Sequence, residues 1–237
     1  MKLSAPLYVL KRRAKELSRK AKLPLHTALD RVATQEGFRS WSLLMARAAT
    51  RLGPAELLAR LEPGDLLLLG ARPFEGKTTM SLRLAAEAMK AGRKAVFFTL
   101  EYPERDVLNR LRAIGEDPSR FSALFDFDCS DAISAATIMK RLDTAQRGTI
   151  AVIDYLQLLD QRRDNPSLME QVRALRAFAR ERGVTIAFIS QIDRSYDPAE
   201  KPCPDLQDVR LPNPLDLSLF DKTCFLHGGE VRFGVVR

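Results

Sequence analysis

The sequence contains few cysteines and histidines, and each shortage excludes a class of protein. Its three cysteines, Cys129, Cys203 and Cys224, are odd in number and lack C-x-x-C spacing. A disulfide framework is therefore not expected, and we interpret the thiols as reduced and structural. Neither of the two histidines, His26 and His227, belongs to a cluster of potential metal ligands in the sequence, so we expect no zinc site.

Long apolar runs are also missing. No stretch approaches the roughly 18 residues that a membrane helix needs. The opening residues, MKLSAPLYVLKRRAKEL, turn basic before a signal-like apolar core can form. With 46% hydrophobic and 29% charged residues, the composition is that of a globular protein. We therefore expect a cytoplasmic protein without a membrane partner, long enough for one α/β domain and a small appendage.

The positive charge is concentrated at the N-terminus. Residues 1–52 contain twelve Lys or Arg against three acidic residues, a net charge of +9, whereas residues 53–237 carry a net charge of −1. A basic segment joined to a neutral domain indicates a polyanionic partner, of which nucleic acid is the leading candidate.

Helical periodicity and strand patterns divide the chain at the same place. Residues 6–50 carry apolar residues at helical spacing, broken at Pro24 and Gly37, which predicts three short helices in a basic segment over 1–52. Residues 53–237 open with a helix at Pro54 and then alternate strands with helices, which predicts an α/β fold with a mostly parallel sheet covered on both faces. We expect strands at 65–70, 95–100, 123–128, 149–155 and 185–190, and helices at 77–91, 103–114, 131–145 and 167–182.

Two features follow the last of these strands. Residues 191–221 contain five prolines and form a connection much longer than the ~4–6 residues usual between elements. Such a loop is often functional, although a surface excursion without a task would look the same. The C-terminal TCFLHGGEVRFGVV predicts a hairpin that turns at Gly228 and Gly229.

Residues 70–79, GARPFEGKTT, predict a phosphate-binding loop of the form G-x-x-x-x-G-K-[ST]. Gly76, Lys77 and Thr78 match, but the first glycine stands one place early, at Gly70, and the motif position holds Ala71. A single methyl group is tolerated there if the φ angle of Ala71 is negative. The loop leaves an expected strand and opens an expected helix, as phosphate binding by backbone amides and a helix N-terminus requires.

Three polar residues stand at the ends of expected strands, at the edge where open α/β sheets bind ligands. Glu101 could orient a water for phosphoryl transfer, or cap the helix that follows Pro103. Asp154 could serve a Mg²⁺ ion through its water shell, or only cap its strand. Gln191 could sense the γ-phosphate and pass its presence into the long loop that follows.

Together these stretches resemble the C-terminal ATPase domain of DnaB-type replicative helicases, which has a RecA-like fold. The resemblance covers roughly residues 60–227 and stops short of the Lys-x-Arg element near the family's C-terminus. We expect the basic segment to stand in place of the family's N-terminal collar domain, and its LPLHTALDRVATQEGFRSWSLLMA resembles a short helical unit fused to assorted bacterial proteins. The resemblance rests on ARPFEGKTT (71–79), FFTLEYP (97–103), IDYLQLL (153–159), the helix around 174–184 and SQIDRS (190–195).

The resemblance implies ATP and Mg²⁺ as cofactors, and it makes Ala71 a family variant. It implies Glu101 as the residue that activates water, Asp154 as the acid on the Mg²⁺ side and Gln191 as the link to the nucleic-acid loop. The loop motif itself makes Lys77 the lysine that reaches the β- and γ-phosphates and Thr78 the hydroxyl that holds Mg²⁺. We therefore expect Glu101, Lys77 and Gln191 as catalytic residues. It also implies that the stretches after Asp154 and Gln191 face DNA, and that the protein forms a homo-oligomer, although not necessarily a closed ring. The nucleotide-binding residues would be Ala71, Arg72, Pro73, Glu75, Gly76, Lys77, Thr78, Thr79 and Asp154, and the DNA-facing cations Arg162, Arg163 and Arg194.

The basic segment suggests a second contact with nucleic acid. Residues 11–22 lie along one expected helix, on which Lys11, Lys15, Arg19 and Lys22 would share a face, with Arg12 beside them. This face could follow a phosphate backbone, or be a solvated helix surface. Residues 28–47 match a helix-turn-helix only weakly, and we expect Phe38 and Trp41 to pack in the core of the segment.

Three functions fit these observations. The first is a Mg²⁺-dependent ATPase acting on DNA as a helicase or translocase. The second is a nucleotide-dependent switch that binds DNA or protein, hydrolyses slowly and does not unwind. The third is a DNA-binding regulator that acts through residues 1–50 and keeps a vestigial ATPase.

Overall fold

The structure is a computed structural model that describes residues 3–5, 7–48, 52–130, 133–160, 165–198, 200–201, 203–211 and 213–236. The chain divides into two compact units, Met1–Leu52 and Gly53–Arg237. We call the first the helical unit and the second the sheet unit. No helix among the described residues is both long and apolar enough to cross a membrane.

The helical unit contains the three predicted helices, α1 (Leu7–Ala21), α2 (Leu25–Gln35) and α3 (Trp41–Ala48). They enclose a small apolar core, against which Phe38 and Trp41 pack as expected. The buried residues of this core are Leu10, Ala14, Val32, Ala33 and Leu44.

One expectation for the helical unit is wrong. Helix α1 ends at Ala21, and Lys22 has a positive φ of 50°. Lys22 therefore leaves the helix and does not share a helical face with Lys11, Lys15 and Arg19. The chain turns here because Leu23 donates its backbone N–H to the carbonyl of Ser18, and because Pro24 cannot continue the helix.

The sheet unit contains a seven-stranded sheet in the order β3-β2-β4-β5-β1-β6-β7. All neighbouring strands are parallel except β6 and β7, which form the predicted hairpin. The predicted mostly parallel sheet is thus confirmed. Its strands are β1 (Leu66–Ala71), β2 (Ala95–Thr99), β3 (Phe125–Asp128), β4 (Ile150–Asp154), β5 (Thr185–Gln191), β6 (Lys222–His227) and β7 (Glu230–Val235).

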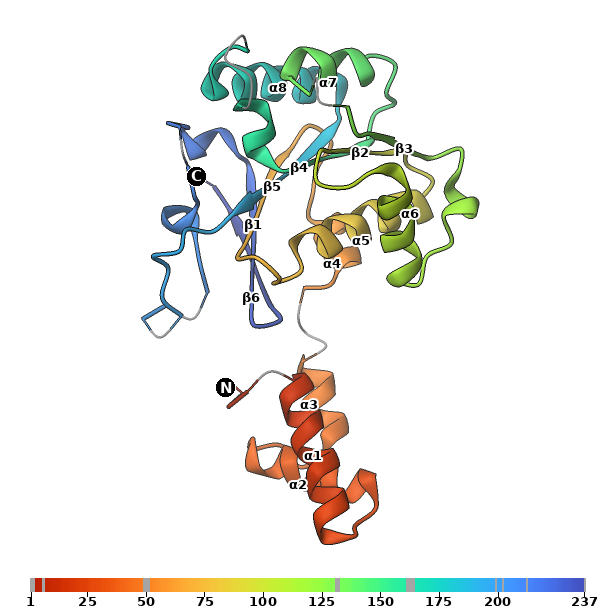
Figure 1. Ribbon diagram of the computed structural model, residues 1–237, viewed down its shortest axis with the longest axis vertical. Helices are drawn as coiled ribbons and strands as arrows, with labels where there is room; N and C mark the ends of the chain where they lie inside the picture. The colour runs from red at the N-terminus through yellow and green to blue at the C-terminus, as the bar shows by residue number, and fades with distance from the viewer. Residues whose placement is uncertain are drawn as a thin grey trace. The chain divides into compact units, whose positions relative to one another are not determined.

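Helices cover both faces of this sheet, with α5 and α6 on one side and α7 and α8 on the other (Figure 1). Helix α7 is shorter than the predicted 131–145, because the hydroxyl of Ser134 caps its first turn and Leu142 ends it. The helices are α4 (Pro54–Ala59), α5 (Lys77–Lys90), α6 (Glu104–Ala113), α7 (Ala135–Arg141) and α8 (Leu168–Arg182), with short 3-10 turns η1 (Pro118–Phe121) and η2 (Leu156–Asp160).

The long segment after β5 has more structure than its prolines suggest. It contains the 3-10 turns η3 (Leu206–Asp208) and η4 (Leu217–Leu219), and an isolated bridge pairs Ile192 with Val209. Its apolar side chains join the main core, so the segment packs on the sheet.

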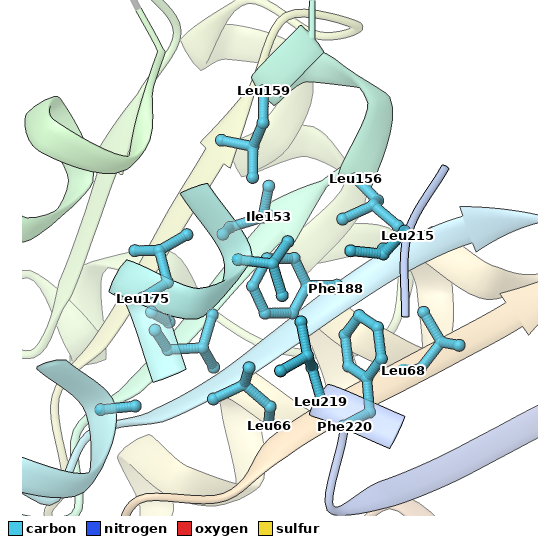
Figure 2. Close-up of a cluster of buried hydrophobic side chains, with 14 of the residues drawn as sticks. Leu66, Leu68, Ile153, Leu156, Leu159, Leu175, Phe188, Leu215, Leu219 and Phe220 are labelled. Carbon is cyan, nitrogen blue, oxygen red and sulfur yellow. The ribbon is translucent and has the colours of Figure 1, made fainter. Parts of the chain in front are cut away.

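The main core lies between the sheet and α8. Phe188 of β5 and Phe220 meet edge to face, with ring centroids 5.4 Å apart. Figure 2 shows both rings among leucines from the β1, α8 and η4 segments. Leu66, Leu68 and Ile153 in the middle of the sheet are fully buried, as strands covered on both faces require. This rigid sheet fixes the positions at which its carboxyl-terminal strand ends present polar residues.

Candidate active site

Strand register brings the candidate residues to one edge of the sheet. Ala71 at the end of β1 pairs with Gln191 at the end of β5. Thr99 at the end of β2 pairs with Asp154 at the end of β4. Glu101 lies two residues after Thr99. The carboxyl ends of these parallel strands therefore place the phosphate loop, Asp154, Glu101 and Gln191 at the same edge.

The phosphate loop runs from the end of β1 to the first residue of α5. Gly76 has a φ of 87°, and nothing lies within 4 Å of the position that a Cβ would occupy. A glycine is therefore favoured here by its backbone conformation and not by lack of space. Phe74 also has a positive φ, 68°, and its ring is fully exposed. Ala71, by contrast, is a buried strand residue and is not among the described residues with positive φ. Its methyl group is therefore tolerated.

Gly70, the early glycine, has a packing role. A Cβ built there would lie 2.7 Å from a ring carbon of Phe225 and 3.1 Å from Cδ1 of Ile192. The ring of Phe225 is buried and cannot move aside freely. The glycine at 70 is therefore explained by the close approach of β6, independently of phosphate binding.

Thr78 and Asp154 make the central contact of the site. The Oγ1 of Thr78, in the first turn of α5, donates a hydrogen bond of 3.1 Å to Oδ2 of Asp154. Both side chains are buried, and Oδ1 of Asp154 has no hydrogen-bond partner among the described residues. A buried carboxylate with one free oxygen beside a hydroxyl is an oxygen donor set that suits Mg²⁺.

Burial, together with the nearby charge of Glu101, raises the pKa of Asp154 to about 7. The hydrogen bond from Thr78 and the charges of Lys77 and Arg110 oppose this shift. The charges of Glu101, Lys77 and Arg110 therefore all act on the Asp154 carboxyl, Glu101 disfavouring its ionised form and the two cations favouring it. An added positive charge at this point would favour the ionised carboxylate.

Glu101 is exposed, two residues after the end of β2. Its backbone N–H donates to the hydroxyl of Thr99 at 3.1 Å, which fixes the chain where it leaves the strand. Helix α6 begins at Glu104, and its N-cap is Pro103 with no side-chain hydrogen bond. Glu101 is therefore not the N-cap, and the alternative interpretation as a helix cap is wrong.

Two residues near the site, Tyr102 and Arg110, were not predicted from the sequence. The guanidinium Cζ of Arg110, on α6, lies 3.9 Å from the ring centroid of Tyr102, a cation–π contact. Burial raises the pKa of the Tyr102 hydroxyl, and the charge of Arg110 opposes that rise. The only sequence signal was the aromatic residue directly after Glu101.

Gln191, at the end of β5, contacts Arg210 in the long segment. Its backbone carbonyl accepts from the N–H of Arg210 at 2.8 Å, and its Oε1 lies 3.5 Å from Nη1 of the same arginine. Gln157, after β4, donates to the carbonyl of Arg210 at 2.9 Å. Arg210 therefore joins the two stretches that follow β4 and β5, a role that the sequence did not reveal.

The remaining predicted residues belong to the phosphate loop, to the segments after β4 and β5, and to the helical unit. In and after the phosphate loop, Pro73 is exposed and Thr79 is partly buried in the first turn of α5. Arg72 donates to the carbonyl of Arg194 at 3.1 Å, and Glu75 accepts from the N–H of Gly228 at 2.9 Å. Arg194 itself is exposed, whereas the predicted DNA-facing residues Arg162 and Arg163 lie outside the described residues. In the helical unit, Lys11, Arg12, Lys15 and Arg19 are exposed on α1.

Comparison with known proteins decides the family. The profile of the DnaB-like helicase C-terminal domain matches residues 55–117 and 123–216. The chain belongs to this family. The resemblance read from the phosphate loop and the strand ends is thereby confirmed over most of the sheet unit.

Curated relatives of this DnaB-like chain are replicative helicases. The replicative DNA helicase DnaB of Buchnera aphidicola subsp. Schizaphis graminum is 28% identical over 204 residues, which cover 72% of this chain and 44% of that protein. DnaB of Haemophilus influenzae is 26% identical over 207 residues, covering 73% of this chain and 44% of the relative. The chain thus spans less than half the length of these relatives.

Solved structures agree on the fold. A solved ATPase domain superposes with a TM-score of 0.56 at 22% identity, covering 70% of each chain. A KaiC-like protein of the hyperthermophilic archaeon Pyrococcus horikoshii gives a TM-score of 0.54 at 18% identity, over 74% of this chain and 80% of that one. A DnaB-like replicative helicase, described with its interactions with primase, gives a TM-score of 0.58 at 17% identity over 96% of this chain and 73% of that one. The predicted RecA-like fold is confirmed.

Proposed function

We propose that this protein binds and hydrolyses ATP with Mg²⁺ and acts on DNA as a helicase or translocase. The observation that supports this most is the buried contact between Thr78 and Asp154, next to Lys77 at the opening of α5. A hydroxyl, a carboxylate and a lysine at the end of a phosphate loop are the groups that P-loop enzymes use on a triphosphate.

The residues present fit a magnesium ion because Thr78 and Asp154 supply oxygen donors and one carboxylate oxygen has no other partner among the described residues. When bound, Mg²⁺ would neutralise charge on the β- and γ-phosphate oxygens. The backbone N–H groups of the loop and the N-terminus of α5 would hold the phosphates. Lys77 would add a positive charge at the same place.

Glu101 would orient the attacking water. It is exposed at the same edge of the sheet and close enough for its charge to raise the pKa of Asp154. Gln191 would respond to the γ-phosphate, because it ends the strand that pairs with β1 and contacts Arg210 of the long segment.

Steady-state ATPase assays with and without single-stranded DNA test this function. Lys77→Ala should abolish turnover, whereas Lys90→Ala, which removes an exposed cation from the other end of the same helix, should leave it unchanged. Full activity in Lys77→Ala would refute the proposal. Strand displacement that depends on hydrolysis would support the helicase assignment specifically.

A slow nucleotide-dependent switch remains the second candidate. The observation that favours it is the hydrogen bond from Arg72 in the phosphate loop to Arg194 in the segment after β5, which offers a route for conformational change without unwinding. A switch should bind DNA or protein in an ATP-dependent way with little turnover. A helicase should instead hydrolyse ATP faster when DNA is present.

We propose that the helical unit also contacts nucleic acid, through the cations exposed on α1. Under the third hypothesis, a regulator with a vestigial ATPase, this unit would account for all DNA binding. Removing residues 1–50 should then abolish DNA binding, and unchanged affinity and salt dependence would exclude that hypothesis. We also propose that the protein forms a homo-oligomer, which a measurement of its molecular size with and without ATP tests. We propose a cytoplasmic location for it.

A further inference from the structure

Two side chains of the phosphate loop make contacts that the proposed hydrolysis does not use. Glu75 accepts a 2.9 Å hydrogen bond from the N–H of Gly228, in the turn between β6 and β7. At the other end of the loop, Nη2 of Arg72 donates to the carbonyl of Arg194 at 3.1 Å. The loop is therefore tied to two segments that are distant in sequence.

Two aromatic rings join these ends. The guanidinium Cζ of Arg72 lies 5.7 Å from the ring centroid of Tyr196, and Tyr196 meets His227 edge to face with centroids 5.6 Å apart. His227 in turn places Nδ1 3.5 Å from Oε1 of Glu75. The backbone N–H of Glu75 also donates to the carbonyl of Arg72 at 3.3 Å. Arg72, Tyr196, His227 and Glu75 thus form a closed series of contacts, which we call the loop circuit.

Tyr196 is the buried member of the loop circuit. It belongs to the main core, and its hydroxyl donates to the carbonyl of Lys201 at 2.8 Å. Lys201 forms ion pairs with Asp205 and Asp208, at 2.6 Å and 2.8 Å. The circuit therefore connects the phosphate loop to an ordered part of the segment after β5.

The loop has two physical reasons to need this support. Phe74 has a left-handed backbone, which is unfavourable for a residue with a side chain and persists only where neighbouring structure enforces it. Glu75 also places a carboxylate directly before Gly76, in a loop that would receive a polyanion. Its hydrogen bond to Gly228 holds that charge in a fixed position.

We propose that Arg72, Tyr196, His227 and Glu75 are positioning residues that hold the phosphate loop in its binding conformation and couple nucleotide binding to residues 193–198. This inference rests on the proposed nucleotide-binding function. Because coupling between two sites is reciprocal, ordering residues 193–198 should tighten nucleotide binding, and nucleotide should order these residues.

Two substitutions of Glu75 separate the hydrogen bond from the charge. Glu75→Gln removes the charge but keeps an oxygen that can accept from Gly228, whereas Glu75→Ala removes both. Titration with a fluorescent ATP analogue and Mg²⁺ should give a Kd about tenfold higher for Glu75→Ala than for Glu75→Gln, as expected for the loss of one hydrogen bond. At saturating ATP, kcat should differ little between them. Equal Kd values would overturn the inference.

The coupling is tested by amide hydrogen exchange. In the unmodified chain, Mg²⁺ and nucleotide should slow exchange at residues 193–198, and Tyr196→Leu should remove this protection while Tyr196→Phe, which keeps the ring, retains it. If Tyr196→Leu does not fold, His227→Leu breaks the circuit at the same ring contact. Protection that survives the break would contradict the coupling.

A double-mutant cycle and a control complete the test. Glu75→Ala and Tyr196→Leu should be non-additive in nucleotide affinity, because both break one circuit; additive losses would contradict it. Glu87→Ala, which removes an exposed ion pair on α5, should leave nucleotide affinity unchanged.

If the unmodified chain binds no nucleotide, the proposed function itself fails. If it binds and the Glu75 variants do not differ, only the loop circuit is refuted.

Discussion

The hydroxyl of Thr78 lies 3.1 Å from Oδ2 of Asp154, although the two residues are 76 positions apart in the chain. This contact joins the first turn of α5 to the end of β4. It leaves the buried carboxylate with a single hydrogen bond among the described residues. Because burial removes the carboxylate from water and only one hydrogen bond replaces that solvation, ionisation of Asp154 is costly. The stability of the folded chain should therefore depend on pH.

In metal-free buffer, stability should fall as pH rises from about 4 to about 7. The folded-state pKa of Asp154 is raised from 3.8 to about 7, so the folded chain keeps a proton that the unfolded chain releases in this window. The loss is complete above pH 7 and is on the order of a few kcal/mol, since one pKa unit corresponds to about 1.4 kcal/mol.

Thermal unfolding with EDTA, compared between the unmodified chain and Asp154→Asn, checks this dependence. The difference in stability between the two should grow in favour of Asp154→Asn as pH increases. Parallel pH profiles would show that Asp154 ionises normally in the folded state. Chelation keeps bound metal from lowering the pKa during the measurement.

Glu101→Gln should slow hydrolysis without preventing nucleotide binding. The amide keeps the size of the side chain but cannot accept a proton from water, and a positioned base contributes typically about 10²–10⁴-fold. Single-turnover hydrolysis and analogue titration measure the two effects separately. Glu104→Gln, an exposed acid in the first turn of α6, is the matched control. A Glu101→Gln variant with normal turnover would assign the base to another residue.

Neutralising Lys11, Lys15 and Arg19 with glutamine should weaken DNA binding in a salt-dependent way. These side chains are exposed on one helix, while the core of the helical unit is formed by other residues. If all three contact duplex phosphates, the slope of log K against log salt should fall by about 3. Fluorescence anisotropy over a salt series measures this slope.

The matched control for that experiment removes three exposed arginines of the sheet unit, Arg105, Arg112 and Arg120. It changes the net charge equally. If both triple variants lose the same affinity and slope, the effect reflects net charge, and α1 is not a specific contact surface. Helical content by circular dichroism confirms that the helical unit remains folded.

Gly70→Ala should destabilise the sheet unit by about 1–3 kcal/mol, the usual cost of overpacking a core. The added Cβ would overlap the buried ring of Phe225 at 2.7 Å. Gly53→Ala is the control, because nothing lies within 4 Å of the added methyl group and its φ is −80°. Denaturant unfolding compares the two. An unchanged midpoint in Gly70→Ala would mean that β6 moves aside without cost.

Local patterns in the sequence were sufficient for most of the fold. The apolar runs at 65–70 and 185–190 predicted buried strands, and the structure has them at Leu66–Ala71 and Thr185–Gln191, because strands covered on both faces need continuous apolar residues. The phosphate loop was also readable, since Gly76 and the start of α5 are fixed by neighbouring residues. Helix ends were less certain: the capping hydroxyl of Ser134 shortened α7, and the turn at Lys22 ended α1 early.

The sequence by itself determined the alternation of strands and helices, the phosphate loop and the concentration of charge in residues 1–52, because these depend on residues close together in the chain. Only the tertiary structure decided why Gly70 is a glycine, which oxygen Thr78 meets, and that Arg110 lies over Tyr102. It also decided that Glu75 reaches Gly228. These contacts depend on sheet register and on packing between distant segments, which no local pattern encodes.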